Sequence, residues 1–373
     1  MSEPSRRDYA LATTAAAQIT APVLNYRPPQ PRNYRPRIAL IGAGGISGAH
    51  LDAYRKAGYT IAVICNRTLS KAAARRDAFF PSAAISDDID GVLTRPGVDV
   101  VDITTHPAER EAMIDRALRA GKHVLSQKPF VLDLNTGRRL ADLADAHGVK
   151  LAVNQNGRWA PHFAYMREAV RSGLIGDPIT CNMAVHWNHG WIKGTPFEQI
   201  DDLIFYDFAI HWFDFLASVI GNRAQSVFAT RARAAAQDVA PPLLAQALVQ
   251  WEGGQGSLIF NAAARFGPMD STYIAGTMGS TSSIGPNLGE QSVELTTAAG
   301  MARPILEGQW FNDGFHGAMG ELLCAIEDHR EPLNGARGNL SSLALAFAAI
   351  ASAHRGSPVV PGAVASLAEA MMS

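Results

Sequence analysis

Short apolar runs and longer mixed stretches alternate along the first part of the chain. The apolar runs carry few charges, as strands that are buried on both faces do. They predict strands at residues 38–41, 59–64, 98–105, 123–126 and 149–153. The mixed stretches between them predict helices at residues 46–56, 70–80, 107–120 and 133–147. This alternation is typical of an α/β fold with a parallel sheet.

The alternation fades after residue 157. A helix at residues 161–172 precedes a series of strand-like runs. These runs lie at residues 179–187, 225–230, 243–251, 255–263, 271–276 and 291–297, and helices are expected at residues 313–328 and 339–354. Strands that follow one another in this way predict a mostly antiparallel sheet. We therefore expect an α/β domain at residues 37–157 and an α+β domain at residues 158–373.

Residues 1–36 differ from the rest of the chain. Residues 12–21 are rich in Ala and Thr, and residues 26–36 are dense in Pro and Arg, which favours extended backbone. We predict an extended arm that lies across the protein or a neighbouring subunit, and a homo-oligomer, either dimer or tetramer. Arg6-Arg7 before a weakly apolar stretch resembles a twin-arginine export signal. That stretch contains Thr and Gln and no convincing cleavage site, so we expect no export.

Composition narrows the class of protein. Hydrophobic residues make up 47% of the chain, and 33 Lys and Arg balance 34 Asp and Glu. This balance argues against nucleic acid or an anionic membrane as a partner, and no apolar run is long enough to span a membrane. Cys65, Cys181 and Cys324 are scattered and lack CxxC spacing. They predict a reducing, cytoplasmic location and argue against disulfides or a zinc site.

A glycine-rich turn joins the first strand to the first helix. Gly42 allows the tight turn, and Gly44 lets the backbone approach a pyrophosphate at the helix N-terminus. The third small position is Ser47, and Gly45 and Ile46 complete the candidate contacts. Strand, glycine turn and helix in this order predict a dinucleotide-binding domain, although any α/β fold can contain a glycine turn.

The end of the second strand bears on the choice of dinucleotide. NAD enzymes usually present Asp or Glu about twenty residues after the glycine turn, to bind the ribose hydroxyls. This chain has Asn66 and Arg67 there. A guanidinium can pair with a 2′-phosphate, which favours NADP, whereas stacking of Arg67 on adenine suits NAD equally. We expect NAD or NADP, with a preference for NADP.

Polar residues follow the later strands at the edge where open parallel sheets bind ligands. Lys128 lies two residues after the strand at residues 123–126, which places it beside the nicotinamide end of a bound cofactor. An exposed loop lysine is the alternative. The cofactor candidates at the strand ends are Thr105, His106, Gln127, Lys128 and Asn156.

A helix at residues 203–216 is apolar on nearly every face and is therefore expected to be buried. Three polar residues, Asp207, His211 and Asp214, lie on one stripe of it. Burying such groups without partners costs on the order of 2–7 kcal/mol each, so a structural network or a substrate must satisfy them. We interpret Asp207 and His211 as a functional pair, in which the carboxylate orients the imidazole, and Asp214 as structural.

Aromatic residues cluster around the polar ones in the second part of the chain. Trp187, Trp191 and Trp310 suit stacking against a sugar ring, and His316 can bind its hydroxyls, although Trp187 and Trp310 can equally belong to the core. His186 and His189 have HxxH spacing without a third ligand, so we predict no metal site.

Together these features resemble the glucose–fructose oxidoreductase/inositol dehydrogenase (Gfo/Idh/MocA) family of NAD(P)-dependent oxidoreductases. Residues 120–129, AGKHVLSQKP, resemble its AGKHVxxEKP signature, with Gln127 in place of Glu. Asp207 and His211 match its D-x-x-x-H pair, and Asn156-Gly-Arg158 matches its polar strand end. The resemblance covers about residues 37–360. Asn66-Arg67 departs from the acidic ribose ligand of NAD-dependent members.

The resemblance implies a dehydrogenase for a sugar or polyol. It implies that His211 is the general base, that Asp207 orients it and that Lys128 stabilises the developing alkoxide. The substrate-binding candidates are Lys128, Asn156, Arg158, Trp187, Trp191, Asp207, His211, Trp310 and His316. A glycosidase that retains its NAD(P) through oxidation, elimination and reduction is one alternative. A non-catalytic NAD(P)-binding regulator is another.

Overall fold

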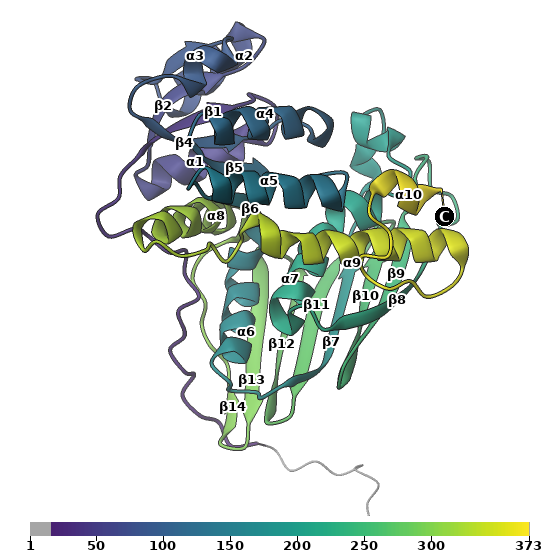
Figure 1. Ribbon diagram of the computed structural model, residues 1–373. Helices are drawn as coiled ribbons and strands as arrows, with labels where there is room; N and C mark the ends of the chain where they lie inside the picture. The colour runs from purple at the N-terminus through teal and green to yellow at the C-terminus, as the bar shows by residue number, and fades with distance from the viewer. Residues whose placement is uncertain (1–15, 373) are drawn as a thin grey trace, which may run out of the picture.

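The computed structural model describes residues 16–372 and contains two sheets (Figure 1). The first has six parallel strands in the order β3-β2-β1-β4-β5-β6. Its strands are β1 (Arg37–Ile41), β2 (Thr60–Cys65), β3 (Ala84–Ser86), β4 (Val98–Ile103), β5 (His123–Gln127) and β6 (Leu151–Asn154). The strand order reverses between β1 and β4, and this reversal creates a crevice at the carboxyl ends of the strands. The predicted α/β fold is confirmed.

Helices connect these strands and cover the sheet. They are α1 (Ser47–Ala57), α2 (Leu69–Phe79), α3 (Ile89–Leu93), α4 (Pro107–Arg119) and α5 (Leu134–Ala146). The sequence did not predict the short elements β3 and α3. The three residues of β3 are only half-buried at the sheet edge, so they carry no strong apolar signal.

The second sheet has eight strands in the order β14-β13-β12-β11-β7-β10-β9-β8. Its strands are β7 (Pro178–His186), β8 (Ala224–Ala232), β9 (Leu244–Trp251), β10 (Gly254–Asn261), β11 (Met269–Gly276), β12 (Gly279–Asn287), β13 (Glu290–Thr297) and β14 (Gly300–Ala302). β10 pairs with β7 in parallel, and the other pairings are antiparallel. The predicted mostly antiparallel sheet is confirmed. The unpredicted strand β12 is rich in Gly and Ser and lacks apolar alternation.

Helices α6 (Pro161–Arg171), α7 (Ile210–Ile220) and α9 (Ala336–Arg355) cover one face of this sheet (Figure 1). Four short turns lie between the helices and strands of this part of the chain. They are η1 (Asn156–Trp159), η2 (Gly190–Ile192), η3 (Pro196–Gln199) and the π-helical turn η4 (Ile204–Phe208). The short helix α10 (Leu367–Met371) packs on α9.

Helix α8 (Trp310–Glu327) returns to the first sheet although it lies late in the chain. Phe315 and Met319 of α8 share a buried cluster with Ile38 and Leu40 of β1. The two sheets are therefore joined by apolar packing as well as by the chain. The boundaries at residues 36 and 157 stay predictions.

The described part of the arm, residues 16–36, runs along the molecule's own surface (Figure 1). The Ile19 N–H donates to the carbonyl of Met301, which extends the edge of the second sheet at β14. Near its other end, the N–H groups of Arg32 and Asn33 donate to the Glu327 carboxylate at 2.7 and 2.6 Å. Arg6-Arg7 lies outside the described residues. Within residues 16–372, every helix is too short or too polar to cross a membrane.

Candidate active site

The glycine turn before α1 leaves open space for a ligand. Gly42 has a φ of +104°, and a Cβ there would come 2.8 Å from Thr104 Oγ1. A Cβ at Gly44 or Gly45 would meet nothing within 4 Å. No side chain caps the first N–H groups of α1, whereas Ser47 Oγ closes the turn by donating to Gly44 O at 2.6 Å. These residues fit a dinucleotide pyrophosphate.

The residues near the end of β2 border this turn. Asn66 Oδ1 accepts a hydrogen bond of 3.0 Å from the Ala43 N–H, so Asn66 holds the turn in place. Arg67 is exposed and lies 3.1 Å from Glu109. Arg75 of α2 donates to Gly44 O at 2.9 Å, which brings a second guanidinium to the turn. Sequence reasoning missed Arg75, although its position two helical turns beyond Arg67 was a usable signal.

The other strand-end candidates also lie along this edge. Thr105 follows β4, and its Cγ2 would lie 3.2 Å from a Cβ at Gly42. His106 is exposed just before α4. Gln127 ends β5 and is buried. The first sheet therefore brings the predicted cofactor residues to one edge.

Lys128 extends from the end of β5 to the second part of the chain. Its Nζ lies 3.2 Å from Asp207 Oδ1 and 2.9 Å from the backbone oxygen of Asp207 in η4. Both side chains are largely buried, with 14% exposure each. The structure thus brings together two residues that are far apart in the sequence, at the predicted edge of the first sheet.

His211 lies in the first turn of α7 and is buried. Its Nδ1 has no hydrogen-bond partner in the described part of the chain. Burial and the positive charge of Lys128 lower the pKa of His211 well below its usual range. The imidazole is therefore neutral at ordinary pH.

The predicted pairing of Asp207 with His211 is wrong. In η4 the Ala209 N–H bonds to the carbonyl of Ile204, five residues back, at 2.7 Å. This wider turn replaces the regular α-helical spacing that the sequence suggested. The Asp207 carboxylate pairs with Lys128, and residues 16–372 contain no hydrogen bond between Asp207 and His211.

Asp214 and Arg158 form a buried ion pair. Arg158 Nε and Nη2 bind the two Asp214 oxygens at 2.6 and 2.9 Å, and Nη1 donates to Leu333 O. Ser342 Oγ also donates to Asp214, at 2.8 Å. This agrees with the structural interpretation of Asp214. Arg158 uses three of its five N–H donors in these contacts, and its role as a substrate ligand stays a prediction.

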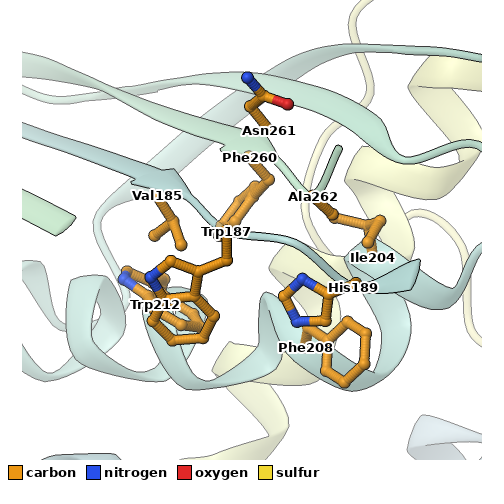
Figure 2. Close-up of a pocket in the computed structure, with 9 residues that line it drawn as sticks. All are labelled: Val185, Trp187, His189, Ile204, Phe208, Trp212, Phe260, Asn261 and Ala262. Carbon is orange, nitrogen blue, oxygen red and sulfur yellow. The ribbon is translucent and has the colours of Figure 1, made fainter. Parts of the chain in front are cut away.

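An aromatic pocket lies beside these groups, with Trp187 and Trp212 next to one another and His189 next to Phe208 (Figure 2). The Trp187 and His189 rings are stacked, with their centroids 5.7 Å apart, and the centroids of the His189 and Phe208 rings lie 4.3 Å apart. Burial lowers the pKa of His189 to about 4, so its ring is neutral. Trp191 is 55% exposed at the pocket's outer side, where it contacts His189 and Phe208.

Several nitrogens in and beside this pocket are buried without a partner among the described residues. They are Trp187 Nε1, Trp212 Nε1, His189 Nδ1 and His211 Nδ1. Unpaired buried polar groups are costly, and the pocket, at about 10 Å³, has room beside them for about one water molecule. Trp212 and His189 were not among the sequence candidates; their aromatic neighbours were the available signal.

The comparisons with known proteins agree with this arrangement. Residues 36–155 match the model of an oxidoreductase family with an NAD-binding Rossmann fold, and residues 163–282 match the GFO/IDH/MocA C-terminal domain. The chain belongs to the GFO/IDH/MocA family. It is therefore an NAD-binding oxidoreductase by family, as its sequence motifs indicated.

Two relatives of this chain are named as dehydrogenases of a sugar and of a polyol. The D-apiose dehydrogenase of Paraburkholderia graminis is 27% identical over 349 residues, which cover 86% of this chain and 88% of that protein. The inositol 2-dehydrogenase of Rhizobium meliloti is 27% identical over 334 residues, covering 85% and 96%. A crystal structure of an Agrobacterium radiobacter oxidoreductase in complex with NAD+, L-tartaric acid and magnesium shares the fold. The two structures superpose with a TM-score of 0.79 at 22% identity, and the match covers 88% of this chain and 99% of the Agrobacterium chain.

The remaining substrate candidates of this GFO/IDH/MocA protein divide into two groups. Trp310 Nε1 donates to Asn156 Oδ1 at 2.8 Å, and the Trp310 ring meets that of His211 edge-on at 5.2 Å. Asn156 and Trp310 therefore border the site. The prediction of His316 is not supported, because its ring packs 5.7 Å from Tyr59, which precedes β2 at the opposite edge of the first sheet.

The described residues contain one cluster with the composition of a metal site, and neither histidine of the HxxH sequence belongs to it. Asp201, Asp202 and His354 are its members. Arg231 lies within 2.6 and 3.0 Å of the two carboxylates and so supplies their positive counter-charge.

Proposed function

We propose that the protein is an NAD(P)-dependent dehydrogenase that oxidises a hydroxyl carbon of a sugar or polyol, or reduces the corresponding carbonyl. The observation that carries this proposal is the neutral, unpaired His211 imidazole near the Lys128–Asp207 pair. These groups lie at the carboxyl edge of a sheet whose glycine turn fits a dinucleotide.

The proposed roles follow from charge and geometry. The bound cofactor supplies the hydride acceptor. His211 accepts the hydroxyl proton, because burial and Lys128 keep the imidazole neutral before the reaction. The Lys128 amine donates to the same substrate oxygen and stabilises the negative charge that develops there. Asp207 holds the amine in place through both its carboxylate and its backbone oxygen.

The substrate class rests mainly on the named relatives. Aromatic rings such as that of Trp310, which lies edge-on to His211, are of the kind that pack against the C–H face of a sugar ring. The relatives named for D-apiose and inositol act on molecules of this kind.

NADP is the proposed cofactor in preference to NAD. The end of β2 presents Asn66 and Arg67 in place of a carboxylate, and Arg75 adds a second positive charge at the glycine turn. Two guanidinium groups in this region can pair with a 2′-phosphate, whereas the end of β2 itself offers no carboxylate to a ribose diol.

A homo-oligomer is proposed through the uncovered face of the second sheet. Apolar side chains there are partly exposed, among them Leu248 at 56% and Tyr273 at 46%. The two depressions on this face are lined without any charged side chain. Depletion of charge is typical of the core of a protein interface, and a second copy of the same face would be self-complementary.

A cytoplasmic location also remains a proposal. The cysteines Cys65, Cys181 and Cys324 are buried and unpaired. This state suits a reducing compartment.

The test is to measure binding of NAD and NADP separately and then to screen sugars and polyols, including apiose and inositol, for a change in reduced cofactor. Lys128→Ala is the control that should bind cofactor but not turn over. Glycoside cleavage without net change in NAD(P)H would favour the retained-cofactor glycosidase. Cofactor binding with no reaction on any sugar or polyol would contradict the proposed dehydrogenase and favour a regulator.

A further inference from the structure

A buried chain of hydrogen bonds begins at the backbone of Lys128. The Lys128 N–H donates to Gln127 Oε1 at 2.8 Å. The same oxygen accepts from Asn154 Nδ2 at 3.0 Å. A backbone N–H can only donate, so the Gln127 atom that faces it must be the amide oxygen, and Asn154 must present its NH2 group.

The chain continues from Asn154 to a carboxylate beneath the sheet edge. Asn154 Nδ2 lies 3.1 Å from His50 Nε2, which must accept because the amide nitrogen only donates. The His50 proton is therefore on Nδ1, which lies 2.7 Å from Asp102 Oδ2. The Tyr54 hydroxyl donates to the same Asp102 oxygen at 2.7 Å.

Burial makes this chain specific. His50, Asp102 and Asn154 have no exposed surface, and Gln127 is 6% exposed. Each hydrogen bond in the chain can run in only one direction. The Lys128 N–H, which can only donate, fixes this direction at one end, and the Asp102 carboxylate, which can only accept, fixes it at the other. In a buried environment a reversed or broken link leaves an unpaired polar group, so the chain favours one position of the Lys128 backbone.

Arg110 holds the same segment from the other side. Its buried guanidinium donates to the carbonyls of Gln127 and Pro129, the residues that flank Lys128. Burial lowers the pKa of Arg110 to about 10, which leaves it charged at ordinary pH. The backbone on both sides of Lys128 is thus fixed by side chains that never reach the substrate.

We propose that His50 is a positioning residue for Lys128, acting through Asn154 and Gln127. The inference rests on the proposed function, in which the Lys128 amine meets the substrate oxygen. The amine contacts Asp207 from this placement of its backbone, so loosening the chain shifts the amine relative to the reacting oxygen. A displacement of about 1 Å in such a group costs on the order of 10²-fold in rate.

Two substitutions separate positioning from simple structural support. The amide of His50→Gln reaches the place of Nε2, so it keeps the link to Asn154 and loses the link to Asp102. The amide of His50→Asn reaches the place of Nδ1, so it keeps the link to Asp102 and loses the link to Asn154. Positioning of Lys128 needs the first link, whereas satisfaction of the buried carboxylate needs the second.

The two variants should therefore rank in opposite orders by kcat and by melting temperature. The kcat should fall about 10- to 100-fold in His50→Asn and less in His50→Gln, with the KM for cofactor nearly unchanged. The melting temperature should fall more in His50→Gln, because Asp102 keeps only Tyr54. If kcat instead follows melting temperature, with His50→Gln worse in both, the role of His50 is structural and the proposal is wrong.

A second variant and a readout without turnover complete the test. Asn154→Leu removes the link while leaving His50 and Asp102 paired, so it remains informative if the His50 variants do not fold. In protein labelled with 15N-lysine and saturated with NADP, amide hydrogen exchange at Lys128 should be faster in Asn154→Leu and His50→Asn than in wild type. Unchanged exchange and kcat in Asn154→Leu would overturn the proposal. Faster exchange in a protein that oxidises no sugar would contradict the proposed function and leave the positioning role supported.

Discussion

The Lys128 amine is held by two different oxygens of Asp207, the carboxylate Oδ1 at 3.2 Å and the backbone oxygen at 2.9 Å. One of these contacts depends on the Asp207 side chain, and the other depends on the shape of η4. The amine therefore joins the edge of the first sheet to the turn before α7. Substitutions at Asp207 can separate the effect of its charge from that of the turn.

Asp207→Asn should lower kcat while leaving the fold intact. An amide oxygen can still accept from Lys128, but the loss of negative charge weakens a contact that is worth about 1.5–3 kcal/mol when charge-assisted. We expect a fall of about 10- to 100-fold in kcat/KM for the sugar, measured by steady-state kinetics. Asp201→Asn is the matched control, since Asp201 is close in sequence but pairs with Arg231. Wild-type kinetics in Asp207→Asn would show that the charge has no role.

His211→Asn should affect turnover far more than stability. The imidazole Nδ1 has no partner within the described chain, so its removal leaves no protein group newly unpaired. Loss of a positioned general base typically costs ~10²–10⁴-fold in rate. Calorimetry and single-turnover kinetics on the same preparation check this expectation. A large drop in melting temperature with normal turnover per folded molecule would instead assign His211 to the scaffold.

Arg67→Ala and Arg75→Ala test the cofactor preference. If both guanidinium groups contact a 2′-phosphate, each substitution should weaken NADP by about 1–3 kcal/mol and NAD much less. Arg75→Ala should also loosen the glycine turn, because it removes the hydrogen bond to Gly44. Isothermal titration with both cofactors distinguishes the two effects. Equal weakening of NAD and NADP by Arg67→Ala would favour stacking on adenine.

Leu248→Arg tests the proposed association through the second sheet. Leu248 is 56% exposed on the uncovered face, where a buried charge would disrupt packing against a second copy. We expect a smaller solution mass by light scattering and an unchanged melting profile at low concentration. Ile305→Arg is the control, because Ile305 is 95% exposed in the loop after β14. An identical mass for wild type and Leu248→Arg would argue against this face as the interface.

Much of the fold could be predicted because its strands are buried on both faces. The apolar runs located β1, β2, β4, β5 and β6 within a few residues. Short or polar elements such as β3 and β12 remained undetected, since their positions depend on pairing with neighbouring strands. The return of α8 to the first sheet is likewise a long-range packing event without a local signal.

The site was predictable in its residues but less so in its pairings. The position of Lys128 followed from the rule for parallel sheets, and Asp207 and His211 followed from their buried stripe. Their partners did not follow, because the π-helical turn directs Asp207 to Lys128 and no local pattern marks such a turn. The pairing of Arg158 with Asp214 likewise had no local signal, since the two residues are 56 positions apart.

Asp270 supplies a pH-dependent prediction outside the site. This residue of β11 is fully buried; its Oδ2 has no partner among residues 16–372, and Oδ1 receives one long hydrogen bond of 3.3 Å from Gln291. Burial raises the pKa of Asp270 from 3.8 to about 7. Between these two pH values the folded protein retains a proton that the unfolded chain has lost, so this contribution to stability is complete at low pH and declines as pH rises to about 7.

Asp270→Asn removes this titration, because its amide stays neutral at every pH. The free energy of unfolding of Asp270→Asn minus that of wild type should therefore increase between pH 4 and pH 8, by on the order of 4 kcal/mol. Burial lowers the pKa of His189 to about 4 and that of His162 to about 3, so these groups destabilise the fold as pH falls below their unfolded range. Their effect is present in both proteins and cancels in the difference. Urea denaturation of the two proteins across this pH range is the measurement, and a difference that does not change with pH would show that Asp270 is ionised in the folded state throughout.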